Sequence, residues 1–150
     1  MEFKIIEAES KNVEQVGKLF DLYRQFYKYD SNLIVSTNYI KDRINNKESK
    51  IFIAINDKNE AIGFVQLYET FGSLDLGKII ILYDLYVEKD YRKNKVGRQL
   101  MIRSHEYAKK IKAKRVQLST ATDNFIGQSL YESLGYVKDT DFYTYDFEIK

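Results

Sequence analysis

The hydrophobic positions of the chain follow two periods, one typical of strands and one typical of helices. Apolar runs, and apolar residues that alternate with polar ones, predict six strands. These strands cover residues 3–8, 51–55, 61–68, 79–87, 116–120 and 142–149. The polar residues 56–59 are typical of a turn and join the second and third strands into a hairpin.

Apolar residues at helical spacing predict four helices between these strands. The first runs to about Tyr29 and is opened by Ser10 or Asn12, and the second covers residues 39–46 after Ser36 or Thr37. The third covers residues 96–110, and the fourth covers 124–134 and ends at Gly135. This order predicts a single domain over residues 1–150, of the α/β or α+β class, with helices on the faces of a mixed sheet.

Composition limits the chemistry that the chain can perform. The 150 residues include no cysteine and one histidine, which excludes disulfides and thiol nucleophiles and argues against a metal site. The same counts argue against a Ser-His-Asp triad. With 13 tyrosines available, acid–base chemistry is expected from Tyr, Asp, Glu or Lys.

Charge and hydropathy argue against two classes of binding partner, nucleic acids and membranes. A net charge of +2 is too small to indicate nucleic acid binding, and the basic run at 109–115 is explained by cations at the end of a helix. The chain has no long apolar run and no signal peptide pattern at its start, so we expect no membrane partner and a cytoplasmic protein.

Residues 79–100 are the segment most indicative of a ligand. An apolar strand leads into a loop that carries Arg92, Lys93 and Lys95, and a helix follows directly. The N–H groups at a helix start, the helix dipole and basic side chains all favour an anion. The segment therefore predicts a site for a phosphate-bearing cofactor.

Two blocks of residues resemble the GCN5-related N-acetyltransferase (GNAT) family, which moves acetyl from acetyl-CoA to an amine. The first block is Arg92-Lys93-Asn94-Lys95-Val96-Gly97, preceded by Leu85-Tyr86-Val87. The second block contains Asn124, Tyr131, Gly135 and Tyr136. The resemblance covers essentially the whole chain, and it implies a mostly antiparallel mixed sheet flanked by about four helices.

The resemblance also implies which residues bind acetyl-CoA. The backbone from Lys93 through Arg98 and that of Val87 would bind pyrophosphate and pantetheine, and an N–H near Leu85 or Tyr86 would bind the thioester carbonyl. Asn124 would bind the pantetheine arm. Tyr131 would act as the general acid that protonates the leaving thiolate. The expected cofactor-binding residues are Leu85, Tyr86, Val87, Arg92, Lys93, Asn94, Lys95, Val96, Gly97, Arg98, Asn124 and Tyr131.

Lys95 departs from the family pattern, because it occupies the position of the usual first glycine. That glycine is favoured where the backbone approaches pyrophosphate closely and takes a positive φ. Lys95 gives up some of this freedom and adds a cation beside the phosphates.

Asp84 is the strongest candidate for a residue that handles the acceptor amine. A lone carboxylate inside an apolar strand needs compensation, which a cationic amine would supply. Asp84 would act as general base or as amine anchor; alternatively, it pairs with a protein Lys or Arg. Glu69 is a second candidate, and tyrosines near the end of the first helix, such as Tyr27, are packing residues or the wall of a substrate pocket.

The leading hypothesis is acetyl transfer by direct attack of a primary amine on a small cationic metabolite, such as a polyamine, an aminoglycoside or a lysine-like molecule. A protein or peptide amine is the alternative acceptor, and a non-catalytic CoA-binding module is the alternative class. A nucleic-acid-binding domain would show strongly salt-dependent binding. The resemblance also implies a homodimer formed through the aromatic residues of 142–149.

Overall fold

A five-stranded sheet organises the larger part of the structure. The structure, a computed structural model, describes residues 1–150 and divides them into two compact parts, Met1–Leu118 and Ser119–Lys150. The strands of the first part lie in the order β1-β2-β3-β4-β5. They are β1 (Phe3–Glu7), β2 (Lys50–Asn56), β3 (Ala61–Gly72), β4 (Gly77–Val87) and β5 (Val116–Gln117). The strands β1 to β4 pair antiparallel and β5 pairs parallel to β4, which confirms the mixed, mostly antiparallel sheet.

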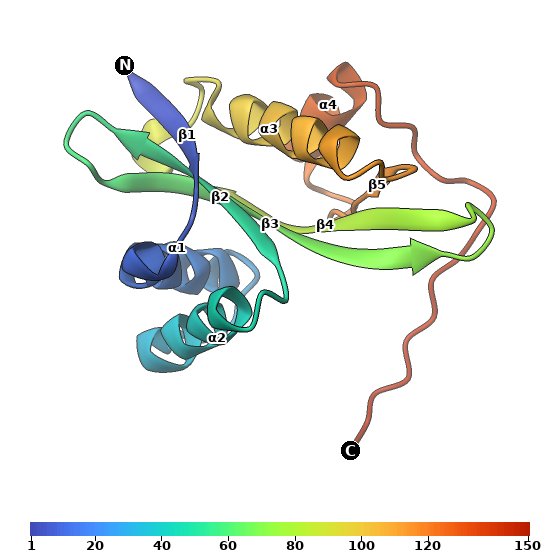
Figure 1. The fold of residues 1–150 in the computed structure, drawn as a ribbon, viewed down its shortest axis with the longest axis horizontal. Helices are drawn as coiled ribbons and strands as arrows, with labels where there is room; N and C mark the ends of the chain where they lie inside the picture. Colours follow the sequence, from blue (N-terminus) through green and yellow to red (C-terminus); the bar gives the residue numbers. More distant parts are fainter. The chain divides into compact units, whose positions relative to one another are not determined.

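Helices cover both faces of this sheet (Figure 1). The helices α1 (Val13–Phe26) and α2 (Leu33–Asn45) lie on one face, and α3 (Val96–Lys110) lies on the other. Their apolar faces are buried, with Val16, Leu19 and Ile40 on the first side and Leu100 and Met101 on the second. Short 3-10 turns precede α1 (Ser10–Asn12) and follow β4 (Lys89–Tyr91).

Several ends of the predicted elements differ from the sequence prediction. The helix α2 begins at Leu33, before Ser36 and Thr37, because the side chain of Asn32 caps it by accepting a hydrogen bond from the Val35 N–H at 3.2 Å. The strands β3 and β4 extend to Gly72 and from Gly77, so most of the predicted connection is part of one long hairpin. The strand β5 has two residues, where the sequence predicted five.

The second part contains α4 (Phe125–Ser133), which confirms the fourth predicted helix and its stop at Gly135, where φ is +94°. The predicted sixth strand over residues 142–149 is wrong. These residues form no strand, and their five apolar side chains are between 76% and 91% exposed. Alternation gives a segment strand propensity, but a strand also needs a partner for its N–H and C=O groups.

None of the helices combines the length and the apolar character that crossing a bilayer requires.

A buried carboxylate, Asp21, holds α1 and the start of α2 together. It is 4% exposed and has no cationic partner within ion-pair distance. It accepts hydrogen bonds from the Ser31 and Ser36 hydroxyls at 2.6 and 2.8 Å, from the Asn32 N–H at 2.9 Å and from the Gln25 amide at 3.0 Å. Burial by itself would raise the pKa of Asp21, but these hydrogen bonds together lower the pKa below its ordinary value.

We expect Asp21→Asn to lower the free energy of unfolding by about 2 kcal/mol at pH 7. The side-chain NH2 of asparagine would replace one acceptor oxygen and would face the hydrogen-bond donors that now bind Asp21. The folded-state pKa of Asp21 lies below the unfolded one, so the stabilisation is present above the unfolded pKa and is lost as the pH falls through the folded pKa. The difference between wild type and variant in urea unfolding should therefore shrink below about pH 4.

Asp42→Asn is the matched control, because Asp42 is an exposed carboxylate on α2 and its replacement should leave stability unchanged. Equal unfolding midpoints for Asp21→Asn and Asp42→Asn at pH 7 would contradict the role of Asp21.

Candidate active site

The loop before α3 has the geometry of an anion site. Lys93 and Lys95 both have φ of +64°, and Lys95 is the N-cap residue of α3. The first hydrogen bond within the helix runs from the Gln99 N–H to the Lys95 carbonyl at 3.0 Å. The N–H groups of Val96 and Gly97 come before it, so they have no carbonyl partner within the helix. No side chain caps this end, and its first turn holds no acidic residue. These features fit a phosphate group.

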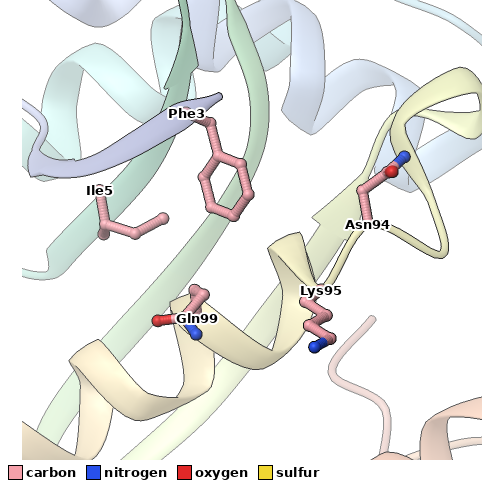
Figure 2. Close-up of a pocket in the computed structure, with 5 residues that line it drawn as sticks. All are labelled: Phe3, Ile5, Asn94, Lys95 and Gln99. Carbon is pink, nitrogen blue, oxygen red and sulfur yellow. The ribbon is translucent and has the colours of Figure 1, made fainter. Parts of the chain in front are cut away.

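Lys95 takes the left-handed conformation that glycine would take most easily at this position. Its side chain lies at a shallow hollow of about 350 Å³ beside the start of α3. Figure 2 shows Asn94, Lys95 and Gln99 on one side of this hollow, and Phe3 and Ile5 of β1 on the other. The sequence therefore keeps the glycine-type backbone and adds a cation next to the helix start.

The strand β4 has one edge that is largely unpaired. It pairs with β5 only at Ile80 and Ile81, so residues 82–87 have β3 alone as a neighbour. The Glu88 N–H donates to the Ile62 carbonyl at 3.0 Å, and in an antiparallel ladder the residues that bond to the partner alternate. The backbone of Tyr86 therefore bonds to β3, while Leu85 and Val87 point to the unpaired edge. An extended ligand with amide groups fits this edge.

Asp84 lies on the face of β4 that α1 covers. It is 3% exposed, and its Oδ2 accepts a hydrogen bond from the Gln66 side-chain amide at 2.6 Å. The Ser49 hydroxyl donates to Oε1 of the Gln66 side chain at 2.8 Å. Burial raises the pKa of Asp84, and the hydrogen bonds from Gln66 and Tyr23 offset only part of this effect.

Asp84 takes part in no ion pair, so the alternative in which it pairs with a protein Lys or Arg is wrong. A carboxylate that is buried without a cation carries a desolvation cost that a bound cation would offset. The structure thus leaves the carboxylate of Asp84 without a cation from the protein.

The charge of Asp84 acts on tyrosines from the end of α1 and from β3. Burial, followed by the negative charge of Asp84, raises the pKa of Tyr23 on α1 and of Tyr27, the residue that caps the end of α1. Asp84 also contributes to the raised pKa of Tyr68 on β3, after burial and the hydrogen bond between the Tyr68 and Tyr39 hydroxyls. Of the two interpretations of the tyrosines in α1, the placement of Tyr27 favours the wall of a site that contains Asp84.

Glu69 lies away from this cluster. The Tyr107 hydroxyl of α3 donates to Glu69 Oε1 at 2.6 Å, and the Lys78 ammonium lies 3.3 Å from Oε2. The hydrogen bond from Tyr107 is the main cause of the lowered pKa of Glu69. The structure therefore places Glu69 on the α3 side of the sheet and does not bring it together with Asp84.

Gln66 and Ser49 were missed by the sequence analysis. Gln66 is fully buried and stands directly opposite Asp84 in the β3–β4 register. The sequence could have pointed to Gln66, because it is a single polar residue inside an apolar strand, as Asp84 is. The pairing of the two strands, which the sequence alone did not give, is what makes them neighbours.

The second part of the structure holds Asn124 and Tyr131. Asn124 caps α4, with its Oδ1 accepting from the Gly127 N–H at 3.1 Å, and its amide donates to the Thr120 hydroxyl at 3.0 Å. Tyr131 lies on α4 with its ring centre 6.1 Å from that of Tyr136. The roles expected for Asn124 and Tyr131 stay predictions.

Comparisons with known proteins identify the family. A profile of the acetyltransferase (GNAT) family matches residues 16–136. The uncharacterized N-acetyltransferase YhfO of Bacillus subtilis (strain 168) is 38% identical over 94% of both chains. A spermidine N(1)-acetyltransferase of Thermoplasma acidophilum is 25% identical over 91% of both chains. A crystal structure of a probable acetyltransferase aligns with a TM-score of 0.91, 34% identity and 98% of both chains covered.

The family match spans far more than half of the chain, and YhfO exceeds 30% identity over nearly its full length. The resemblance seen in the phosphate loop and in the second block is thereby confirmed at the level of the family. The chain belongs to the acetyltransferase (GNAT) family, and it is an N-acetyltransferase that uses acetyl-CoA.

Proposed function

We propose that this enzyme acetylates the primary amine of a small cationic molecule by direct attack. The observation that carries the proposal is Asp84, a buried carboxylate that has no cationic partner and whose charge contributes to the raised pKa of Tyr23 and Tyr27. Aromatic rings and a carboxylate are the groups that bind an ammonium ion. The similarity to a spermidine N(1)-acetyltransferase supports a cationic amine as the acceptor class.

Asp84 can both bind such an amine in its ammonium form and accept a proton from it. A lysine-type amine has a pKa near 10.4, so only about one molecule in 2,500 is neutral at pH 7. The enzyme must bind the ammonium form and then remove a proton from its nitrogen. A carboxylate with a raised pKa can do both, as anchor first and as proton acceptor afterwards.

The unpaired edge of β4 and the start of α3 fit the two ends of the cofactor. When bound, acetyl-CoA supplies the activated acetyl group. The Leu85 N–H donates a hydrogen bond of the oxyanion type to the acyl carbonyl, since the backbone of Tyr86 is engaged with β3. Val87 binds the pantetheine amides, and the N–H groups of Val96 and Gly97 bind the pyrophosphate. Lys93 and Lys95 add positive charge to the same loop.

Tyr131 is the proposed general acid. Its hydroxyl holds a proton at neutral pH, because the ordinary pKa of tyrosine is near 10. It supplies this proton from Oη to the departing thiolate sulfur. Asn124 is proposed to bind the pantetheine arm. Both roles rest on the match of these residues to the second block of the family.

We expect Asp84→Asn and Tyr131→Phe each to lower kcat/KM by at least about tenfold, because each removes one proton-transfer group. The measurement is thiol release from acetyl-CoA with polyamines, aminoglycosides, amino acids and a lysine-rich peptide as acceptors. The matched control is Asp42→Asn, which changes an exposed carboxylate outside the proposed site.

Turnover of the lysine-rich peptide alone would favour the alternative of a protein or peptide amine acetyltransferase. Full activity in both Asp84→Asn and Tyr131→Phe would overturn the proposed residue roles.

Lys95→Gly should raise the free energy of unfolding by about 1 kcal/mol, because glycine adopts the left-handed conformation without steric cost. It should also weaken CoA binding by up to about fivefold at low ionic strength, because one cation near the phosphates is lost. Urea unfolding and calorimetric titration with CoA measure the two effects. Lys89→Gly is the control, since Lys89 is not in the left-handed region and its replacement should not stabilise the protein.

We also propose a homodimer formed through residues 142–149. Their exposed side chains alternate as in a strand, and a strand from a second copy would satisfy their backbone groups. Light scattering at micromolar concentration should give the mass of a dimer, and Phe147→Asp should reduce it toward that of a monomer. A monomeric wild-type protein at that concentration would refute the dimer.

A further inference from the structure

Arg92 lies over aromatic rings on the α1 face of the sheet. Its guanidinium carbon is 5.8 Å from the ring centre of Phe26 and 5.5 Å from that of Tyr86. The ring of Tyr86 packs against the core cluster under α1, and Arg92 Nε donates to the Val87 carbonyl at 2.9 Å. Arg92 forms no ion pair. Its cationic group is therefore directed to the face that carries Asp84.

Two routes lead from Arg92 toward Asp84. At the end of α1, the ring centre of Phe26 lies 5.2 Å from that of Tyr27, and the ring centre of Tyr27 lies 5.1 Å from that of Tyr23. The negative charge of Asp84 contributes to the raised pKa of both Tyr23 and Tyr27. Along β4, Tyr86 stands two residues from Asp84 on the same face, about 6.6 Å away. We call these rings, Tyr23, Phe26, Tyr27 and Tyr86, the aromatic cluster.

The aromatic cluster thus lies between two opposite charges, and neither of them forms an ion pair in the protein. Asp84 is the buried anion and Arg92 is the exposed cation. A polyamine would satisfy Asp84 but would bring further positive charge close to Arg92, and a simple monoamine would leave Arg92 unpaired. A molecule with one ammonium and one carboxylate satisfies both groups, and the planar guanidinium is suited to a carboxylate.

From this juxtaposition of Asp84 and Arg92 across the aromatic cluster, we infer that the acceptor is an amino-acid-type zwitterion, whose amine binds Asp84 and whose carboxylate binds Arg92. The inference rests on the proposed function, keeps the ammonium group as the part of the acceptor that reacts, and replaces a polyamine-type acceptor by one that also carries a carboxylate. It also gives Arg92 a role in acceptor specificity, where the family resemblance had placed it among the cofactor-binding residues.

The chemistry of the transfer is unchanged by this assignment. The bound ammonium loses one proton to Asp84, the neutral amine forms the C–N bond to the acyl carbon, and the acyl C–S bond breaks. The thiolate takes up a proton from Tyr131, and the second proton that leaves the nitrogen restores the Tyr131 hydroxyl. The carboxylate takes no part in the reaction and serves only to orient the amine. Acetylation removes the positive charge, so the product keeps its contact with Arg92 and loses its contact with Asp84, which favours release.

The test compares acceptors that differ only in the carboxylate. The pairs are phenylalanine and phenethylamine, tyrosine and tyramine, and ornithine and putrescine, with phenylalaninamide as a neutral analogue. We expect kcat/KM for thiol release to be at least about tenfold higher for an amino acid than for its amine in one or more pairs, with the difference mainly in KM. Arg92→Met should reduce this ratio to about one by raising KM for the amino acid.

Arg24→Met is the matched control, because the Arg24 guanidinium also lies over a tyrosine ring, that of Tyr29 at 5.0 Å, outside the aromatic cluster. This variant should keep the ratio of the wild type. A second readout is independent of turnover. In the presence of CoA, N-acetylphenylalanine should stabilise the wild-type protein against heat more than N-acetylphenethylamine does, and Arg92→Met should remove the difference.

Equal or better turnover of the amines overturns the inference and leaves the proposed function standing. An Arg92→Met variant that raises KM for acetyl-CoA with every acceptor, and leaves the acceptor ratio unchanged, overturns it as well, because Arg92 would then be a phosphate ligand. Absence of turnover with every acceptor, by a protein that still binds CoA, overturns the proposed function together with the inference.

Discussion

A carboxylate buried in an apolar sheet without a cation is the constraint around which the proposed active site is built. Removing a charged group from water is costly, and Asp84 regains only part of that cost through Gln66 and Tyr23. The remaining cost makes a bound ammonium ion more favourable at this position than at an exposed carboxylate. Gln66 is in turn oriented by Ser49, so its amide presents a donor to Asp84. The sheet thereby holds the Asp84 carboxylate on the face that α1 covers.

One strand, β4, supplies three different surfaces for the proposed reaction. Its α1 face carries Asp84, and its edge beyond Ile81 carries the backbone groups of Leu85 and Val87. Its carboxyl end leads into the loop before α3. Because side chains alternate between the faces of a strand while backbone groups alternate between its edges, a few residues can serve an amine, an acyl group and a phosphate without interfering. The short length of β5 is what leaves the edge unpaired.

The loop between β4 and α3 contains backbone conformations that lower the stability of the protein. Lys93 and Lys95 both occupy the left-handed region, which is unfavourable for residues with a side chain. The helix start that follows has neither a capping side chain nor an acidic residue. The left-handed residues lower the stability of the free protein, and the proposed binding of a phosphate to the uncapped N–H groups would offset part of this cost.

The sequence by itself determined much of the framework. It gave the helix over residues 96–110, the central hairpin, the cap of α4 at Asn124, the basic loop before α3 and the lone carboxylate Asp84, because these depend on periodicity, capping chemistry and local charge. Tertiary structure decided which of these residues meet. Gln66 faces Asp84 through the register of β3 and β4, and Glu69, three residues further, belongs to the opposite face and pairs with Tyr107. The side chain of Arg92 turns toward Phe26 and Tyr86, and residues 142–149 form no strand despite their alternation. These outcomes depend on strand pairing and on contacts between distant residues, which a local pattern does not contain.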